Sequence, residues 1–361
     1  MRKRSSFFLI LPVVLLSFFA GCAEKKAESS SIISPENNPN LSLLPIREVL
    51  RERLPNYDTL YFSSGQGYEF KNARPNKVII TMDGGPEFFG TRIGRYNDEV
   101  LGSRVYDLFL HLYGEYSIFV LEKFDWGRGK QPAPFNDIRE RERYTVDNLM
   151  ENYAEVIREY LSQNDYKTII IAGFSEGGFI APELYFRLEG INVSGLIAIA
   201  AGGLSPYENF ELLLEKLPTR AVPFQIPENV TEDMVKERDS YFEAFYGSVL
   251  ETYRFEPYPD SPEPFGGPDE PHYPNTFRWL DSFLFRRPID FYRDIDVPVL
   301  FLHGEMDVRV AVESTRYVEE ALPGKPFSYR YYPEMWHQPR FYGEFMAIRR
   351  DISAWLKAEG L

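Results

Sequence analysis

Short apolar stretches alternate with amphipathic stretches along most of the chain. Five of the apolar runs are rich in β-branched residues and almost continuously hydrophobic, a pattern typical of strands buried on both faces of a parallel sheet. They read "KVIITM" at 77–82, "YSIFVLE" at 116–122, "TIIIAGF" at 168–174, "SGLIAIAA" at 194–201 and "VPVLFLHG" at 297–304.

Two amphipathic segments predict long helices between and after these runs. In the segment 145–163, apolar side chains recur at helical spacing, as at Leu149, Tyr153 and Val156. Near the end of the chain, "FSYRYYP" at 327–333 predicts a last strand, and the segment 341–360 predicts the helix after it. Strands that alternate with helices in this way predict an α/β fold with right-handed crossovers.

One long segment, residues 203–289, interrupts this alternation. It holds two helical patterns, at 208–217 and 232–255, and then a stretch dense in Pro and Gly at 256–275. A connection of this length is too long for a simple loop. We therefore predict a mainly helical cap at 203–289, inserted into a catalytic domain formed by 46–202 and 290–361.

The N-terminal segment predicts export. A basic start, an apolar run and a small-residue exit are the layout of a signal peptide over 1–21. Cys22, the single cysteine, follows Ala20-Gly21 directly, an arrangement that resembles the lipobox of bacterial lipoproteins. The polar residues 22–45 predict a disordered tether. We expect a protein anchored in the bacterial cell envelope through lipid on Cys22, facing the periplasm or in the outer membrane.

The composition of the chain limits the kinds of partner that the protein can bind and indicates how it is stabilised. The formal net charge is −14, and an acidic surface repels phosphate backbones, so we expect no nucleic acid partner. A hydrophobic content of 44% over 361 residues is sufficient for a large core. With one cysteine, the exported domain has to be stabilised by that core and not by disulfides.

A serine stands where the run 168–174 must end and a helix must begin. Gly173 to Gly177 read G-F-S-E-G, which fits the nucleophile elbow, a sharp strand-to-helix turn that exposes its central serine above the sheet edge. The glycines on either side leave room where a Cβ would collide. We predict Ser175 as a nucleophile, with Pro182 near the start of the following helix.

A serine hydroxyl needs a base, and the chain has four histidines. His337 follows the last predicted strand, so it projects at the same sheet edge as the elbow. His303 lies within a strand end, where a packed, hydrogen-bonded imidazole is expected. His111 lies in a predicted helix and His272 in the cap. We select His337 as the base.

The carboxylate that orients this base should follow another strand. Asp307 comes after the run 297–304, with Gly304 providing the turn. Glu305, two residues nearer the strand, and Glu334, close to His337 in sequence, are the competitors. The order Ser175, Asp307, His337 along the chain favours Asp307, because α/β-hydrolases use that order.

Acyl transfer also needs backbone N–H groups directed at the developing oxyanion. One predicted donor is Glu176, directly after the nucleophile. The other is Gly85, in the glycine pair that follows the run 77–82. An ordinary strand-ending turn is the other interpretation of this pair.

The chain resembles the α/β-hydrolase family over residues 55–202 and 285–361. The resemblance rests on G-F-S-E-G at 173–177, H-G-E-M-D at 303–307, the Trp336-His337 loop and D-G-G-P at 83–86. The last motif is similar to the H-G-G-P loop of proline iminopeptidase-like members, with Asp83 in place of their histidine. The resemblance implies an eight-stranded, mostly parallel sheet with helices on both faces and a helical cap after the sixth strand.

Three functions remain open at this point. The first is a serine esterase that acts on a small ester through an acyl-enzyme, and the second is an N-terminal aminopeptidase that acts on short peptides. The third is a non-catalytic lipoprotein that binds a ligand or partner. The two enzymes require no metal and no organic cofactor. Aromatic rings of the cap, such as Tyr241, Phe242 and Trp279, either select an apolar substrate group or form the cap's own core.

Overall fold

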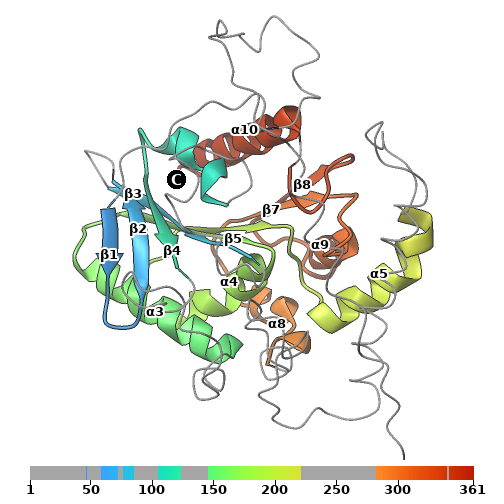
Figure 1. Cartoon of the computed structure of the whole chain (residues 1–361), viewed down its shortest axis with the longest axis horizontal. Coiled ribbons are helices and arrows are strands. Elements are labelled where there is room, and N and C mark those ends of the chain that lie inside the picture. Colours follow the sequence, from blue (N-terminus) through green and yellow to red (C-terminus); the bar gives the residue numbers. More distant parts are fainter. Residues whose placement is uncertain are drawn as a thin grey trace, which may run out of the picture.

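Figure 1 shows a computed structural model of the chain. The residues that the structure describes are 46, 58–71, 76–84, 105–122, 145–220, 282–339 and 341–361. The predicted signal peptide, Cys22, the tether and most of the cap lie outside the described residues. Gly85 and His272 lie outside them too.

The described part is built on one sheet of eight strands, in the order β1-β2-β4-β3-β5-β6-β7-β8. The first two strands pair antiparallel, β2 pairs antiparallel with β4, and all other neighbours are parallel. The strands are β1 Asp58–Tyr61, β2 Gln66–Phe70, β3 Lys77–Met82, β4 Ser117–Leu121, β5 Thr168–Phe174, β6 Gly195–Ile199, β7 Val299–Gly304 and β8 Phe327–Tyr332.

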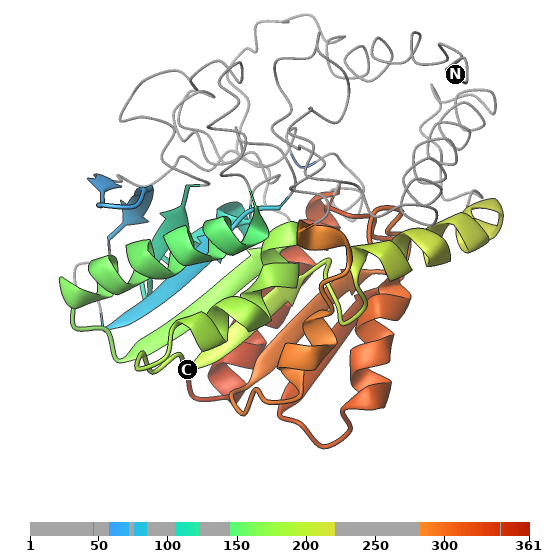
Figure 2. The same ribbon diagram turned by 90° about the horizontal axis from the view of Figure 1, so that it is seen from below.

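Helices cover both faces of this sheet (Figures 1 and 2). One face packs against α3 Val146–Ser162, α4 Glu176–Arg187, α8 Pro288–Tyr292 and α9 Val312–Ala321. The other packs against α10 Tyr342–Ala358 and two short 3-10 turns, η3 Tyr106–Leu108 and η4 Leu110–Leu112. This sheet order with helices on both faces is the α/β-hydrolase fold, so the predicted fold class is confirmed.

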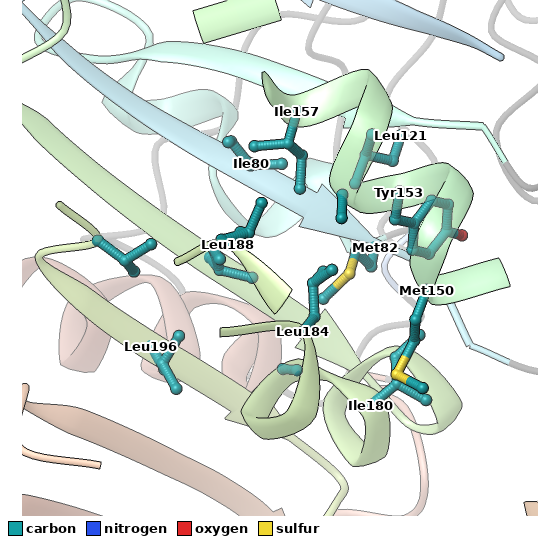
Figure 3. Close-up of a cluster of buried hydrophobic side chains, with 14 of the residues drawn as sticks. Ile80, Met82, Leu121, Met150, Tyr153, Ile157, Ile180, Leu184, Leu188 and Leu196 are labelled. Atoms are coloured by element: carbon teal, nitrogen blue, oxygen red, sulfur yellow. The ribbon is translucent and has the colours of Figure 1, made fainter. Parts of the chain in front are cut away.

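The continuous apolar runs are explained by the two buried faces. In β3, Val78 and Ile80 point into the core under α3 and α4, whereas Ile79, between them, points into the core under α10. A strand between two helical layers alternates between two cores, so every position is apolar. Figure 3 shows part of the first core, where Met150 and Tyr153 of α3 lie near Ile180 and Leu184 of α4.

Two local expectations are corrected. Pro182 lies in the interior of α4, not near its start. Pro182 has no N–H to donate within the helix. Helix α4 nevertheless continues through it, because its residues from Glu176 to Pro182 are all buried and their packing offsets the missing backbone hydrogen bond. His111 lies in the 3-10 turn η4, not in a regular helix, and its Nε2 lies 2.8 Å from the Oγ of Ser353.

Helix α5, Pro206–Arg220, begins the segment predicted as a cap and projects away from the sheet (Figure 1). It covers the predicted helix 208–217. In the part of the chain that the structure describes, no helix combines the length and apolar character needed to cross a membrane.

Candidate active site

Ser175 occupies the turn between β5 and α4. Its backbone has φ 53° and ψ −119°, and apart from Ala200 it is the only non-glycine residue with positive φ in the described parts of the chain. Such a conformation costs about 1–3 kcal/mol and persists only when its surroundings hold it. Here the N–H of Ser175 donates to the carbonyl of Ile199 at 2.8 Å, and its own carbonyl accepts from the N–H of Phe179 at 2.9 Å.

The glycines on either side of this turn are sterically required. A Cβ on Gly173 would lie 2.2 Å from the carbonyl oxygen of Gly177, and a Cβ on Gly177 would lie 2.5 Å from that of Met82. Both contacts are with backbone atoms, which cannot move aside cheaply. The elbow can therefore form only because Gly173 and Gly177 carry no Cβ.

His337 lies in the loop between β8 and α10, and its side chain reaches the elbow. Its Nε2 is 3.0 Å from the Oγ of Ser175, although 162 residues separate the two in sequence. Its ring packs against Phe174, with centroids 4.9 Å apart, and the residue is only 8% exposed. The base proposed from sequence and the predicted nucleophile are thus within hydrogen-bonding distance.

Asp307, in the loop after β7, completes the chain of contacts. Its Oδ2 lies 2.8 Å from the Nδ1 of His337, and its Oδ1 accepts the N–H groups of Arg309 at 2.7 Å and Val310 at 2.9 Å. Because a carboxylate accepts, Nδ1 of His337 carries the proton and Nε2 is free to accept from the Ser175 hydroxyl. The side chain of Asp307 is fully buried.

The environment keeps Asp307 ionised. Burial alone would raise its pKa, but the charge of His337 and hydrogen bonds from His303 and His337 hold that pKa well below its usual range. An ionised, buried carboxylate in this place can stabilise an imidazolium on His337.

The competing residues are placed elsewhere. Glu305 pairs with Arg316, and Glu334 is exposed. His303 is buried behind Asp307, and the exposed His111 contacts Ser353 of α10, on the opposite face of the sheet from α4. Of the alternatives left open by the sequence, the geometry therefore favours Asp307 and His337.

The predicted oxyanion donors are described in part. Glu176 is the first residue of α4, where backbone N–H groups have no acceptor within the helix. Gly84 brings the loop after β3 against the elbow, since a Cβ on Gly84 would lie 3.2 Å from the amide nitrogen of Glu176. Gly85 lies outside the described residues, so its role stays a prediction.

Three buried carboxyl groups near the elbow were not assigned from sequence. Asp83, Glu122 and Glu176 are 9%, 5% and 6% exposed, and the Oδ1 of Asp83 accepts the N–H of Val105 at 3.1 Å. Burial, followed by the charges of Glu176, Glu122 and Asp83, raises the pKa of Tyr153 well above its usual value. These carboxyl groups follow β3, β4 and β5, at the edge of the sheet that carries Ser175.

Asn209 is a further residue that was not predicted from the sequence. It belongs to α5, is 1% exposed, and its Oδ1 accepts the N–H of Ala311 at 3.1 Å. Its amide nitrogen donates to the carbonyls of Leu204 and Ser205. No local pattern signals a contact with a residue 102 positions away. Asn209 links the first helix of the predicted cap to the loop that carries Asp307.

Within the described ranges, no three His, Cys, Asp or Glu side chains are grouped so as to hold a metal ion.

The chain was compared with known protein families, curated proteins and solved structures, and only solved structures are similar to it. No family model matches the chain, and no curated protein matches its sequence. An acylaminoacyl peptidase of Pyrococcus horikoshii is similar with 17% identity and a TM-score of 0.46, over 86% of this chain and 42% of the peptidase. The chain thus spans less than half the length of that protein.

Two esterases are similar over nearly their whole length. Est1E from Butyrivibrio proteoclasticus is 13% identical, with a TM-score of 0.46, over 84% of this chain and 98% of the esterase. The esterase EaEST from Exiguobacterium antarcticum is 14% identical, with a TM-score of 0.47, over 84% of this chain and 100% of the esterase.

Proposed function

We propose that the chain is a serine hydrolase that cleaves a carboxylic ester, or a related acyl bond, through an acyl-enzyme. The observation that carries the proposal is the continuous line of contacts from Ser175 Oγ through the ring of His337 to the carboxylate of Asp307, at 3.0 and 2.8 Å. The strained backbone of Ser175 adds to it, since strain of this kind is concentrated at functional sites.

In the proposed reaction, Ser175 Oγ attacks the acyl carbon while Nε2 of His337 takes the hydroxyl proton. Asp307 stabilises the imidazolium that forms and holds the ring in the correct tautomer. The N–H groups of Glu176 and Gly85 stabilise the oxyanion. Collapse of this intermediate expels the alcohol, which takes the proton from His337. Water, deprotonated by His337, then attacks the acyl-enzyme, releases the acid and restores Ser175.

A second candidate is an aminopeptidase that acts on the free amino end of a short peptide. The observation that favours it is the group of buried carboxyl side chains at Asp83, Glu122 and Glu176. Ionised carboxylates at these positions would attract an ammonium group. A neutral ester gains nothing from the same field, so the two candidates differ in the charge of the substrate that they prefer.

Turnover of matched substrates tests both candidates. The full chain and its Ser175→Ala variant are assayed with p-nitrophenyl acyl esters and with aminoacyl p-nitroanilides. Ester cleavage that disappears in Ser175→Ala supports the esterase, and cleavage of the anilides alone reverses the order of the two candidates. No turnover of any substrate by the wild type would leave the non-catalytic lipoprotein as the better account, and equal turnover by Ser175→Ala would mean that another residue is the nucleophile.

We also propose that Cys22 carries the lipid that tethers the protein in the cell envelope. The support is the sequence alone, with Cys22 directly after the small residues Ala20 and Gly21. Bacteria that express the full chain and are fed labelled palmitate should incorporate label into the wild type and not into Cys22→Ser. Label in both variants would rule out Cys22 as the lipidated residue.

A further inference from the structure

A second imidazole lies behind the carboxylate of Asp307. His303, in β7, has no exposed surface, and its Nε2 is 3.4 Å from the Oδ2 of Asp307, the oxygen that also faces His337. Asp307 is therefore placed between two histidines. The proposed reaction uses His337 and assigns nothing to His303.

The surroundings of His303 fix the proton on Nδ1. This nitrogen lies 2.7 Å from the hydroxyl oxygen of Thr315. The same hydroxyl lies 2.7 Å from the carbonyl oxygen of Ala201, which can only accept, so the proton of Thr315 is donated to Ala201. Thr315 then has only lone pairs to offer to His303, and Nδ1 must donate.

The other ring nitrogen also faces acceptors. Nε2 of His303 lies 3.0 Å from the carbonyl oxygen of Val310, in addition to its approach to Asp307. A bare nitrogen lone pair would repel both oxygens, so Nε2 must donate as well. A ring that donates from both nitrogens is an imidazolium. Among the described residues, the charged side chain in contact with the ring is that of Asp307. Thr315 of α9 adds a hydroxyl, and this hydroxyl contacts the carbonyl of Ala201, two residues after β6.

We propose that His303 is a positioning residue that, as a doubly protonated imidazole, holds the carboxylate of Asp307 in the orientation that His337 requires. The proposal rests on the proposed function, because Asp307 matters to catalysis only if His337 is the base. Nε2–H of His303 bridges Val310 and Asp307, and the N–H groups of Arg309 and Val310 hold the other carboxylate oxygen. Rotation of the carboxylate away from His337 would break both sets of contacts.

The ionisation of Asp307 agrees with this arrangement. Burial would raise the pKa of Asp307, and the hydrogen bond from His303 is among the contacts that lower it, together with the charge of His337. A positive ring behind the carboxylate offsets part of the cost of burying that charge.

The protonation state of His303 can be measured by NMR, independently of whether the protein has catalytic activity. In the full chain labelled with 15N-histidine, two-bond correlation spectra at pH 7 should show both ring nitrogens of His303 at the shifts of protonated nitrogen, assigned by their loss in His303→Gln. The Nδ1 proton of His337 should move in His303→Gln and stay in place in His111→Gln. One bare nitrogen on His303 at pH 7 would overturn the proposal, even if the chain proved not to be a hydrolase.

Kinetics then test the positioning role. His303→Gln should lower kcat about 10- to 100-fold with little change in KM, less than the roughly 10⁴-fold loss expected when the carboxylate itself is removed. His111→Gln is the matched control, since its imidazole also contacts a hydroxyl group, that of Ser353, but lies at the exposed surface. If His303→Gln does not fold, Thr315→Val, which keeps the ring and removes the Nδ1 acceptor, should lower kcat several-fold. A folded His303→Gln or Thr315→Val variant with wild-type kcat would contradict the proposal.

Discussion

Gly84 lies so close to Ser175 that a Cβ on Gly84 would be 2.5 Å from the Cβ of the serine. The same atom would lie 2.5 Å from the carbonyl oxygen of Phe174. Strands β3 and β5 are parallel neighbours that end side by side, with Met82 opposite Gly173. The loop after β3 and the elbow after β5 therefore form one continuous backbone surface beside the hydroxyl of Ser175.

Gly84→Ala should displace this surface. The added methyl group meets backbone and cannot be accommodated without movement, so we expect a loss of about 1–3 kcal/mol in the free energy of unfolding and a lower kcat. Gly114→Ala is the control, because a Cβ on Gly114 has no neighbour within 4 Å. Urea unfolding and ester turnover measure both effects. A Gly84→Ala variant with wild-type stability and kcat would show that the two loops do not touch.

Asp307→Asn should lower kcat by roughly 10⁴-fold with little change in KM, because the amide favours the wrong tautomer of His337. Glu305→Gln is the matched control, since Glu305 lies in the same loop and pairs with Arg316. Steady-state kinetics of the two variants show whether Asp307 or Glu305 is the carboxylate that orients His337. An equal loss in Glu305→Gln would mean that the loop, and not the carboxylate of Asp307, is what matters.

Acid conditions should weaken the fold through Asp307. Its pKa in the folded protein lies below the value of about 4 expected in the unfolded chain. The unfolded state therefore binds the proton first as pH falls, so the stabilisation is present above about pH 4 and is lost progressively below it. Urea unfolding at pH 6 and at pH 3 should show a smaller decline for Asp307→Asn than for wild type. Parallel declines would exclude this residue as a source of acid sensitivity.

Asn209→Ala should affect stability and catalysis together. Removal of the buried amide leaves the N–H of Ala311 without its acceptor, which costs about 1–3 kcal/mol. The loop that carries Asp307 then loses its contact with α5, and kcat should fall. The exposed Asn192→Ala serves as control. Thermal unfolding and kcat are measured on the same samples. A wild-type kcat despite a lower melting temperature would show that the contact between Asn209 and Ala311 does not support catalysis.

The strands that lie between two helical layers could be predicted from the sequence. The runs 77–82 and 168–174 coincide with β3 and β5 because burial on both faces makes every position apolar. Strand β2 gave no such signal, because it contains Gly67 and the buried Glu69. The carboxylate of Glu69 accepts the hydroxyl groups of Tyr160 and Tyr166 at 2.7 and 2.9 Å, contacts with residues about ninety positions away.

In the candidate site, too, the residues that follow predictable strands could be proposed from the sequence, whereas the residues held by tertiary contacts could not. Ser175, Asp307 and His337 could be proposed because each follows a strand that is visible in the sequence, and parallel strands end at one edge. The partners of His303 and Asn209 could not, since Thr315, Val310 and Ala311 meet them only through tertiary contacts. Pro182 was misplaced because local propensity says nothing of the packing that supports α4.

The most direct test of the central claim is covalent labelling by a fluorophosphonate. The account predicts that the full chain gains one adduct, that mass spectrometry places it on Ser175, and that labelling disappears in Ser175→Ala but persists in the exposed control Ser162→Ala. An unlabelled wild type, or undiminished labelling of Ser175→Ala, would contradict the assignment of Ser175 as the nucleophile.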